Sequence, residues 1–426
     1  MTLTILLVSF AVLIFLRVPV AFSMGVSAVL AIVLGGKGLP LELIPQRMYV
    51  MIDSSSLLAI PFFILAGELM EQGGLSARMI RFAQSLVGHW RGGLAQVAVL
   101  ANTIFSALTG SSAAAASAIG SIMIPAMKEK GYPAAFAASI NASAASIGPI
   151  IPPSIIMVVY GSITGVSVSA MFMAGIVPGL IIAAGLMALN WIYAYRNGWG
   201  SEPRQTIGQI IKSFSSSIWA LLAPVIIIGG IIGGIFTPTE AGAVAVVYAG
   251  LVARFVYHEL PMARLKNILS KAAYSTGMVA FIMASAGIFG WLLAVEQVPQ
   301  TVVSAILSVT DTPGLAILLV IAIVLVIGAV VEVTAAVVLI VPVFYPLGQA
   351  LGFNDVHFGI ILCVALVFGN VTPPVGLLLY ITSAISGSRI GEIMRYQWSS
   401  LVVLVTALLI VTYSETITLM FTGLLK

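Results

Sequence analysis

The segment Gly148-Pro-Ile-Ile-Pro-Pro-Ser154 has a counterpart 221 residues further along the chain, Gly369-Asn-Val-Thr-Pro-Pro-Val375. The same offset superimposes three further helix-breaking pairs: Pro40 on Pro261, Pro125 on Pro346 and Gly131 on Gly352. Four of the chain's 20 prolines thus pair with four others at one offset, which indicates an internal duplication. Proline removes a backbone donor and clashes with the preceding turn, so both segments predict broken helices.

The composition is that of a polytopic membrane protein. Of 426 residues, 60% are hydrophobic and 8% are charged, whereas soluble proteins carry about 25% charged residues. At about 20 apolar residues per span, we expect roughly ten to twelve crossings and no room for a soluble catalytic domain. The single cysteine, Cys363, excludes an internal disulfide and a CxxC metal site. The apolar start without a basic leader predicts no cleaved signal peptide.

The basic residues predict the orientation, because lysine and arginine in short loops stay in the cytoplasm. Four clusters mark the predicted inside: Arg78/Arg81/Arg91, Lys128/Lys130, Arg196/Arg204/Lys212 with Arg254/Arg264/Lys266/Lys271, and Arg389/Arg395. The stretch 272–388 has no lysine or arginine, and its connecting segments carry Glu296, Asp311 and Asp355. We therefore expect these connecting segments to lie outside.

Two apolar segments begin and end on one face, which predicts re-entrant hairpins. The first, 94–127, lies between inside clusters and has its midpoint at Thr109-Gly-Ser-Ser112. The second, 314–345, lies between outside segments and has its midpoint near Val330–Thr334. Broken helices follow them at 133–166 and 356–388. Because the two hairpins enter from opposite faces, the prediction is an all-α fold of two inverted-topology repeats.

The predicted repeats divide the chain into a mobile transport domain and a scaffold. Residues 57–166 and 273–388 are the expected transport parts, and residues 1–56 and 167–272 are scaffold helices with interfacial arms. A C-terminal helix, 389–426, completes the chain. The arms are the amphipathic segments 40–50 and 261–270, which suit the plane of the membrane interface. Lys37 and Arg47 would then lie outside, against the positive-inside rule.

The breaks and hairpin tips supply oxygen ligands. Carbonyl groups freed within a bilayer must be satisfied by protein, ions or water, and hard alkali cations prefer oxygen. One predicted cation site combines Gly148 and Pro152 with the hydroxyls of Ser111 and Ser112. The predicted second site has other members: Thr334, Gly369 and Thr372.

Helix N-termini at the tips attract anions, which predicts a carboxylate substrate between them. The expected substrate residues are Gly110, Asn141, Ser143, Ser146 and Asn370. The tip sequence Gly110-Ser-Ser-Ala113 alone is also typical of close helix packing.

Glu332 is the acidic residue at a hairpin tip. An intramembrane carboxylate is a functional candidate, which could bind a cation, carry a coupling proton or reach solvent.

Other functions fit the residues less well. Gly110-Ser-Ser-Ala113 superficially resembles the nucleophile turn of an intramembrane serine hydrolase, which needs a nearby base. The three histidines, His89, His258 and His357, fall in basic loops or near the outer face. No HExxH or phosphate-binding loop motif occurs, so the chain is expected to be no enzyme and no ATPase. A channel stays an alternative; saturable, cation-dependent flux would favour a transporter.

The motifs in their order resemble the DctM-type large membrane subunit of tripartite ATP-independent periplasmic (TRAP) transporters. They are Phe62-Phe-Ile-Leu-Ala-Gly67, Gly110-Ser-Ser-Ala113, Ile151-Pro-Pro-Ser154, Phe236-Thr-Pro-Thr-Glu240 and Thr372-Pro-Pro-Val-Gly376. The resemblance spans essentially the whole chain. A stand-alone sodium- or proton-coupled anion transporter of a related inverted-repeat family is the alternative.

The resemblance implies a sodium-driven elevator importer in the bacterial inner membrane. Its partners would be a separate four-helix DctQ-type membrane subunit and a periplasmic DctP-type protein that delivers a C4-dicarboxylate, sugar acid or sialic acid. Sodium would be the coupling ion, with no other cofactor. By this resemblance, sodium sites fall on Ser111, Ser112, Gly148 and Pro152, and on Thr334, Gly369 and Thr372. Val331-Glu332 replaces Ser-Ser at the second tip, so the two sites should differ chemically.

Overall fold

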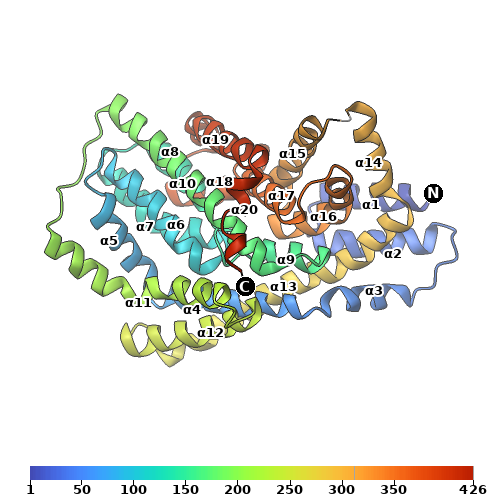
Figure 1. Cartoon of the computed structure of the whole chain (residues 1–426), viewed down its shortest axis with the longest axis horizontal. Helices are drawn as coiled ribbons and strands as arrows, with labels where there is room; N and C mark the ends of the chain where they lie inside the picture. Colours follow the sequence, from blue (N-terminus) through green and yellow to red (C-terminus); the bar gives the residue numbers. More distant parts are fainter. Residues whose placement is uncertain (311, 426) are drawn as a thin grey trace.

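The computed structural model describes residues 1–310 and 312–425, so Asp311 of the predicted outer segments lies outside the described residues. Within this part the chain is helical and no strand occurs (Figure 1). The helices of the first half are α1 Thr2–Phe15, α2 Val20–Leu34, α3 Leu43–Ile52, the short turn η1 Ser55–Leu58, α4 Ala59–Gln72, α5 Leu75–Val87, α6 Gly93–Thr109, α7 Ser112–Glu129, α8 Ala134–Ala145, α9 Ile155–Thr164 and α10 Val168–Asn197.

The second half repeats this succession of long and short helices. They are α11 Ile207–Ile232, α12 Pro238–Leu251, the π-helical turn η2 Val252–Val256, α13 Met262–Val295, α14 Val298–Val309, α15 Pro313–Val330, α16 Val333–Ala350, α17 Asp355–Gly369, α18 Leu377–Ser386, α19 Ile390–Tyr413, α20 Glu415–Leu419 and η3 Thr422–Leu424.

Fewer helices can cross a membrane than the predicted ten to twelve. In residues 1–310 and 312–425, seven are long and apolar enough, or eight if α3 and α4, bent by 61° at their junction, form one span. The difference lies in the shorter apolar helices, which are not long enough to cross alone. Eight of the apolar helices in this part of the chain, including both halves of each broken helix, are only 10 to 17 residues long.

The two halves exchange contacts in a reciprocal way. Helix α9, the second half of the first broken helix, packs on hairpin helix α16, and α18 packs on α7 (Figure 1). Helices α10 and α19, at equivalent places in the two halves, pack on each other. Reciprocal contacts of this kind are what a twofold relation between two similar units requires. They bring both hairpins and both broken helices into one core.

The predicted second interfacial arm, 261–270, is not a separate segment, because α13 runs unbroken for 34 residues. In the first half the equivalent helices α3 and α4 are separated at Asp53-Ser-Ser-Ser56, whereas the aligned segment of α13 is Tyr274-Ser-Thr-Gly277. Asp and Ser side chains favour caps and turns over helix interiors, which accounts for the break in the first half only.

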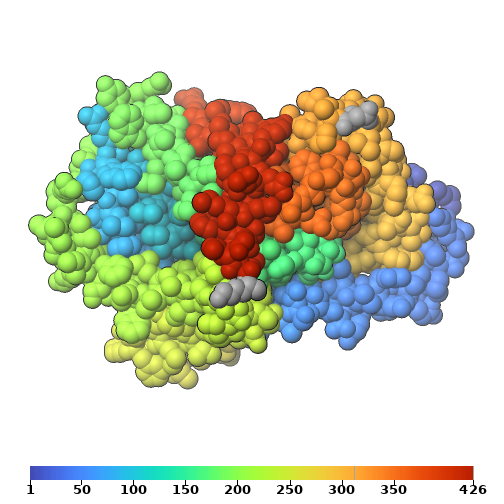
Figure 2. Space-filling view, viewed as in Figure 1, coloured from blue at the N-terminus to red at the C-terminus, as the bar shows by residue number. Residues whose placement is uncertain are grey.

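The predicted C-terminal helix 389–426 is also divided. Helix α19 ends at Tyr413, and α20 turns back to pack on α10 and α17. Figure 2 shows this C-terminal segment in red, lying between the first-half helices in green and the second-half helices in orange. It therefore covers the junction of the two halves on this face.

Contacts between distant loops bring the predicted inside clusters together. Lys130 pairs with Glu202 at 3.0 Å, and Lys128 donates to the carbonyl of Ser386 at 3.2 Å. Arg78 in α5 pairs with Glu259 after η2 at 2.7 Å. All three contacts connect basic segments that were assigned to one face.

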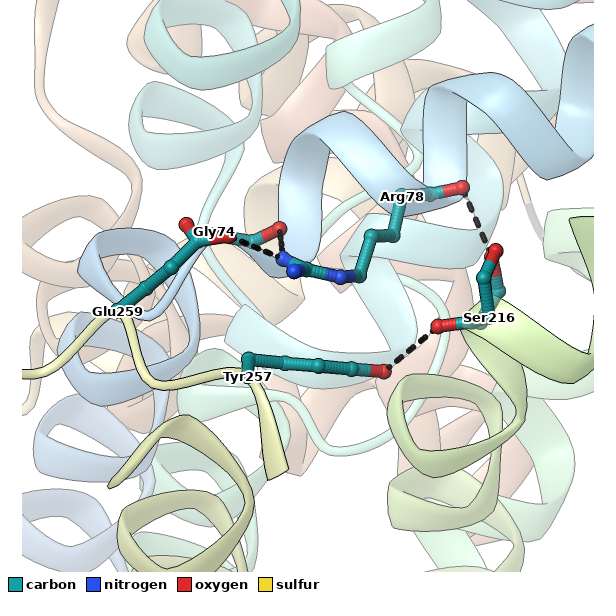
Figure 3. Close-up of polar contacts among 6 residues, drawn as sticks. Gly74, Arg78, Ser216, Tyr257 and Glu259 are labelled. Carbon is teal, nitrogen blue, oxygen red and sulfur yellow. Dashed lines mark hydrogen bonds and ion pairs between the residues drawn. The ribbon is translucent and has the colours of Figure 1, made fainter. Parts of the chain in front are cut away.

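Arg78 is the centre of the cluster in Figure 3. Its guanidinium donates to the Gly74 carbonyl at 2.8 Å and to Glu259, and lies 3.8 Å from the centre of the Tyr257 ring. Burial raises the pKa of the Tyr257 phenol, whose hydroxyl donates to the carbonyl of Ser216 in α11. Since the Ser217 hydroxyl also donates to the Arg78 carbonyl, α5 is fastened to α11.

A second ion pair also joins the two halves, at the reciprocal place. Lys37, after α2, pairs at 2.7 Å with Glu296, at the junction of α13 and α14. Lys37 and Glu296 lie within three residues of the positions equivalent to Glu259 and Arg78, with the charges exchanged. In each pair the residue on the helix is the more buried. The Arg78 and Glu296 side chains are 16% and 14% exposed, whereas those of Glu259 and Lys37 are 44% and 45% exposed. The pair neutralises Lys37, one of the two residues that depart from the positive-inside rule.

Candidate functional site

The first hairpin turns over two residues. Helix α6 ends at Thr109, Gly110 has a left-handed φ of 60°, and Ser111 is extended. A side chain at Gly110 would meet the Pro153 carbonyl oxygen, so only glycine suits both the φ value and the space. The Ser111 hydroxyl accepts from the amide of Ala114 at 3.3 Å and caps α7.

The first break places its glycine directly against this tip. Helix α8 ends at Ala145 and α9 begins at Ile155. A Cβ on Gly148 would lie 3.1 Å from the carbonyl carbon of Ser111 and 3.1 Å from the nitrogen of Ser112. The structure therefore brings together four predicted site residues: Gly110, Ser111, Ser112 and Gly148.

The break leaves buried carbonyl groups without donors. Ser154 caps α9 by accepting from the amide of Met157, and its hydroxyl donates to the Pro149 carbonyl. The carbonyls of Gly148 and Pro152 accept no hydrogen bond from residues 1–310 or 312–425, although both residues are buried. Buried carbonyls normally have partners, so these oxygens are candidates to bind a cation or water.

Helix α10 packs against the first break. A side chain at Gly175 would meet the Ile150 carbonyl, and one at Gly179 would meet the Ile151 side chain. Gly175 and Gly179 form a GxxxG pattern, which permits close approach of backbones. The aligned positions of α19 are Tyr396 and Ser400.

The second break is correspondingly more open than the first. Residues 146–154 are all buried, whereas Pro374 and Val375 are exposed. The two breaks are therefore related in sequence but differ in how far their surroundings enclose them.

The second tip is capped by Glu332. The 221-residue offset aligns Glu332 with Ser111, so Glu332-Val333 rather than Val331-Glu332 replaces the two serines. Helix α15 ends at Val330 and α16 begins at Val333. The Glu332 carboxylate accepts from the amide of Ala335 at 3.1 Å and from the hydroxyl of Thr334 at 3.0 Å, while the residue as a whole is exposed. The same N-cap position thus carries a neutral hydroxyl in one repeat and a carboxylate in the other.

The second break packs on the turn that precedes its tip. A Cβ on Gly369 would lie 2.6 Å from the Gly328 Cα and 2.7 Å from the Ala329 nitrogen. The amide of Gly376 donates to the Ala329 carbonyl at 3.2 Å, and the Thr372 hydroxyl donates to the Phe368 carbonyl at 2.7 Å. Gly369 and Thr372 therefore lie in the same break, whereas Thr334 at the tip is hydrogen-bonded to Glu332.

Three predicted substrate residues have their polar atoms engaged inside the protein. Asn141 accepts from Asn102 at 3.1 Å and donates to the carbonyl of Ala116 at 3.0 Å. Ser143 is hydrogen-bonded to Gln397 of α19, and the Ser146 hydroxyl donates to the Ser143 carbonyl at 2.7 Å. All three residues are fully buried. Asn141 and Ser143 thus hold α8 to α6, α7 and α19, whereas Ser146 bonds back to the end of α8.

Asn370 differs from these three residues. Its side-chain nitrogen is buried and has no hydrogen-bond partner in the described part of the chain, while its main-chain carbonyl accepts from Leu378 at 3.2 Å. Asn370 therefore keeps an unused donor at the second break.

Sequence reasoning missed two contributors to this region. Gln397 accepts from the hydroxyls of Ser139 and Ser143 at 2.9 and 3.2 Å. A fully buried amide in an apolar helix is a recognisable sign of an interhelical hydrogen bond. Gly175 and Gly179 form a GxxxG pattern that the sequence displays, but the sequence does not show that the first break is the segment they contact.

The chain is similar to known membrane transport proteins over nearly its whole length. Residues 7–417 match the family described as "Tripartite ATP-independent periplasmic transporter, DctM component". The chain is 40% identical to the C4-dicarboxylate TRAP transporter large permease protein DctM of Pseudomonas aeruginosa, with 93% of each chain covered. It is also 40% identical to the isethionate TRAP transporter permease protein DctMQ of Oleidesulfovibrio alaskensis, covering 97% of this chain and 65% of that one.

A solved structure has a similar fold. The YdaH transporter of Alcanivorax borkumensis superimposes with a TM-score of 0.64 over 86% of both chains at 14% identity. At this identity the likeness concerns the fold alone.

Proposed function

This chain belongs to the DctM family of TRAP transporters, and from that premise we propose that it is the large permease of a sodium-coupled importer for a small carboxylate-bearing solute. Its family is one of permeases rather than enzymes, and it is a multi-pass protein of the inner membrane. The observation that carries the proposal is the pairing of each hairpin tip with a helix break. Gly148 contacts the first tip, and Gly369 contacts the turn before the second.

The first cation site uses neutral oxygens. Buried carbonyls at Gly148 and Pro152 without hydrogen-bond donors lie in the same break that contacts Ser111 and Ser112. An alkali cation satisfies such oxygens without a counter-charge. The second site adds a carboxylate, because Glu332 caps the tip and binds the hydroxyl of Thr334. We therefore assign sodium to both sites and different affinities to the two.

The solute is an anion held between the tips. The N-termini of α7 and α16 begin there, and amide groups at helix starts favour negative charge. Gly110 and the free amide of Asn370 are the substrate contacts that we retain. The relatives are named for C4-dicarboxylate and isethionate, which are both small organic anions. A C4-dicarboxylate, sugar acid or sialic acid would fit this class.

The transport cycle is an elevator movement of the hairpins and broken helices against the scaffold. The contacts of Arg78 link α5 to α11, and α5 also packs on hairpin helix α6, so α5 lies where the predicted moving segment 57–166 meets the scaffold. A DctQ-type small membrane subunit and a DctP-type periplasmic binding protein complete the system. The name of the DctMQ relative supports a small-subunit partner.

Charge balance limits the stoichiometry. Moving one net charge across 100 mV is worth about 2.3 kcal/mol, which two sodium ions with a monoanion would gain. Two sodium ions with a dianion move no net charge, so electrogenic import of a dicarboxylate needs a third cation. Glu332 is the candidate to carry it as a proton.

The test is uptake into proteoliposomes that contain the permease with its small subunit and binding protein. We expect uptake in a sodium gradient, none in a potassium gradient, and strong losses for Ser112→Ala and Thr372→Ala. Ser121→Ala in α7 and Thr406→Ala in α19 are matched controls, because both hydroxyls lie on exposed residues away from the tips. Equal uptake in potassium would refute sodium coupling.

A further inference from the structure

A cleft lined by residues with polar side chains opens between α5 and the first turns of α11. Its volume is about 440 Å³, and its lining residues are Arg81, Gln84, Gln205, Gln209, Lys212, Ser213 and Ser216. The lining thus combines two cations, three amides and two hydroxyls, with no acidic residue. Such a set can hold an oxyanion by charge-assisted hydrogen bonds.

The two cations of the cleft have no acidic partner in the described chain. The ion pairs of residues 1–310 and 312–425 involve Arg78, Lys37 and Lys130, but neither Arg81 nor Lys212. The contrast with Arg78, one turn earlier in α5, is direct, because Glu259, Gly74 and Tyr257 surround that guanidinium (Figure 3). The charges of Arg81 and Lys212 therefore stay available to a ligand.

A buried hydroxyl is also unused. The Ser213 Oγ atom is shielded from solvent and has no hydrogen-bond partner among the described residues. The Ser216 hydroxyl already donates its one proton to the Ser213 carbonyl at 2.8 Å, which leaves Ser213 as the unused hydroxyl. A buried hydroxyl without a partner is costly, so Ser213 would gain by turning its hydroxyl into the cleft toward a bound oxyanion.

The cleft faces water rather than lipid. Gln209, Lys212, Ser213 and Ser216 recur every three to four residues and share one face of α11. The exposed apolar residues of the same turns lie on the opposite face: Ile207 at 77%, Ile211 at 61% and Phe214 at 44% exposure. A lipid with its head group in the cleft could not lay its acyl chains along that stripe.

The cleft also borders the first hairpin. Arg81 and Gln84 line an adjoining cleft of about 420 Å³, whose other wall includes Met123 and Ala126 of α7. The acidic residues there are Glu129 and Glu202, and Glu202 is paired with Lys130. The basic cleft therefore opens beside the predicted cytoplasmic end of the moving hairpin.

We propose that the cleft between α5 and α11 is an oxyanion site that takes a small carboxylate or phosphate from the cytoplasm, with Arg81 and Lys212 as its charged ligands. That the carboxylate is the imported solute after release rests on the proposed function. This site is distinct from the sodium-dependent site at the tips, and it needs no sodium.

The test measures thermal stabilisation of the purified full-length permease in potassium chloride, without sodium, so that the tip site stays empty. The probes are succinate, inorganic phosphate and phosphatidylglycerol vesicles. We expect succinate and phosphate to stabilise the wild type. Arg81→Gln and Lys212→Gln should each raise the ligand concentration at half-saturation about tenfold, which corresponds to about 1.4 kcal/mol of binding free energy. Lys266→Gln, which removes a charge from a different exposed position, should leave binding unchanged.

Each outcome decides between the alternatives. Equal responses of wild type, Arg81→Gln and Lys212→Gln would overturn the site. Stabilisation by phosphatidylglycerol alone would overturn the aqueous ligand in favour of lipid. Ser213→Ala should weaken binding modestly, and it tests the cleft without removing charge. Because sodium is absent, failure of sodium-coupled uptake would leave a positive binding result intact, and the reverse also holds.

Discussion

The contact between the second break and its hairpin can be tested at Gly369. An alanine there would place its Cβ 2.6 Å from the Gly328 Cα and 2.7 Å from the Ala329 nitrogen, where real Cβ atoms essentially never come within 3.0 Å. Both neighbours are backbone atoms, so α15 must move away. Overpacking of this kind costs about 1 to 3 kcal/mol.

The equivalent change at Gly148 should be milder. Its Cβ would lie 3.1 Å from the Ser111 and Ser112 backbone, which a shift of a few tenths of an ångström relieves. Gly277→Ala in α13 is the matched control, because no atom lies within 4 Å of its Cβ. In a helix interior that change should stabilise the protein by about 0.5 to 1 kcal/mol.

The assay is thermal unfolding of the purified protein in sodium chloride and in potassium chloride at equal ionic strength. Sodium that binds only the folded state adds stability as its concentration exceeds the dissociation constant. A tenfold loss of affinity removes about 1.4 kcal/mol of that increment at saturation. We expect Gly369→Ala to lose at least this much, Gly148→Ala to lose less and Gly277→Ala to lose none. If sodium stabilised Gly369→Ala as much as it stabilises the wild type, a cation site at this contact would be refuted.

Three other perturbations have defined outcomes. Glu332→Gln should reduce the charge moved per dicarboxylate, measured as current against radiolabelled uptake, and unchanged charge movement would remove Glu332 as a proton carrier. A double-mutant cycle between Arg78→Ala and Glu259→Ala should give a coupling of about 0.5 to 1 kcal/mol, because Glu259 is half-exposed; zero coupling would show that the pair does not fasten α5. Cys363 is fully buried, so a thiol reagent should label it only in denaturant, and rapid labelling of the folded protein would contradict its packing.

The features of the fold that could be predicted are those fixed by local backbone chemistry. Proline pairs and glycines placed both breaks, and the small, polar tip at Gly110-Ser111 marked the first hairpin turn. The continuity of α13 was missed, because hydrophobic patterning does not distinguish an interfacial arm from the first turns of a long helix. The fastening of α5 to α11 depends on contacts between distant segments, which no local pattern contains.

The sequence indicated which helices and turns form the candidate site, but not which way their side chains point. Helix α8 is buried on all faces, so periodicity gives no indication of which face meets a substrate. Asn141 and Ser143 therefore looked like lining residues, although they are hydrogen-bonded to Asn102 and Gln397. The unequal enclosure of the two breaks depends on Gly175, whose contact with Ile150 becomes visible only when α10 is packed.

The two repeats place an N-cap interaction at the same position but make it with different chemical groups. The N-cap is Ser111 in one repeat and Glu332 in the other, yet each accepts from the amide three residues later. An N-cap needs only an oxygen acceptor, and a carboxylate satisfies it as well as a hydroxyl does. The capping role therefore left the charge at this position free to differ between the repeats. A carboxylate at one tip alone gives that tip a proton-binding group that its counterpart lacks, and the two proposed cation sites can then differ in charge while their backbones stay alike.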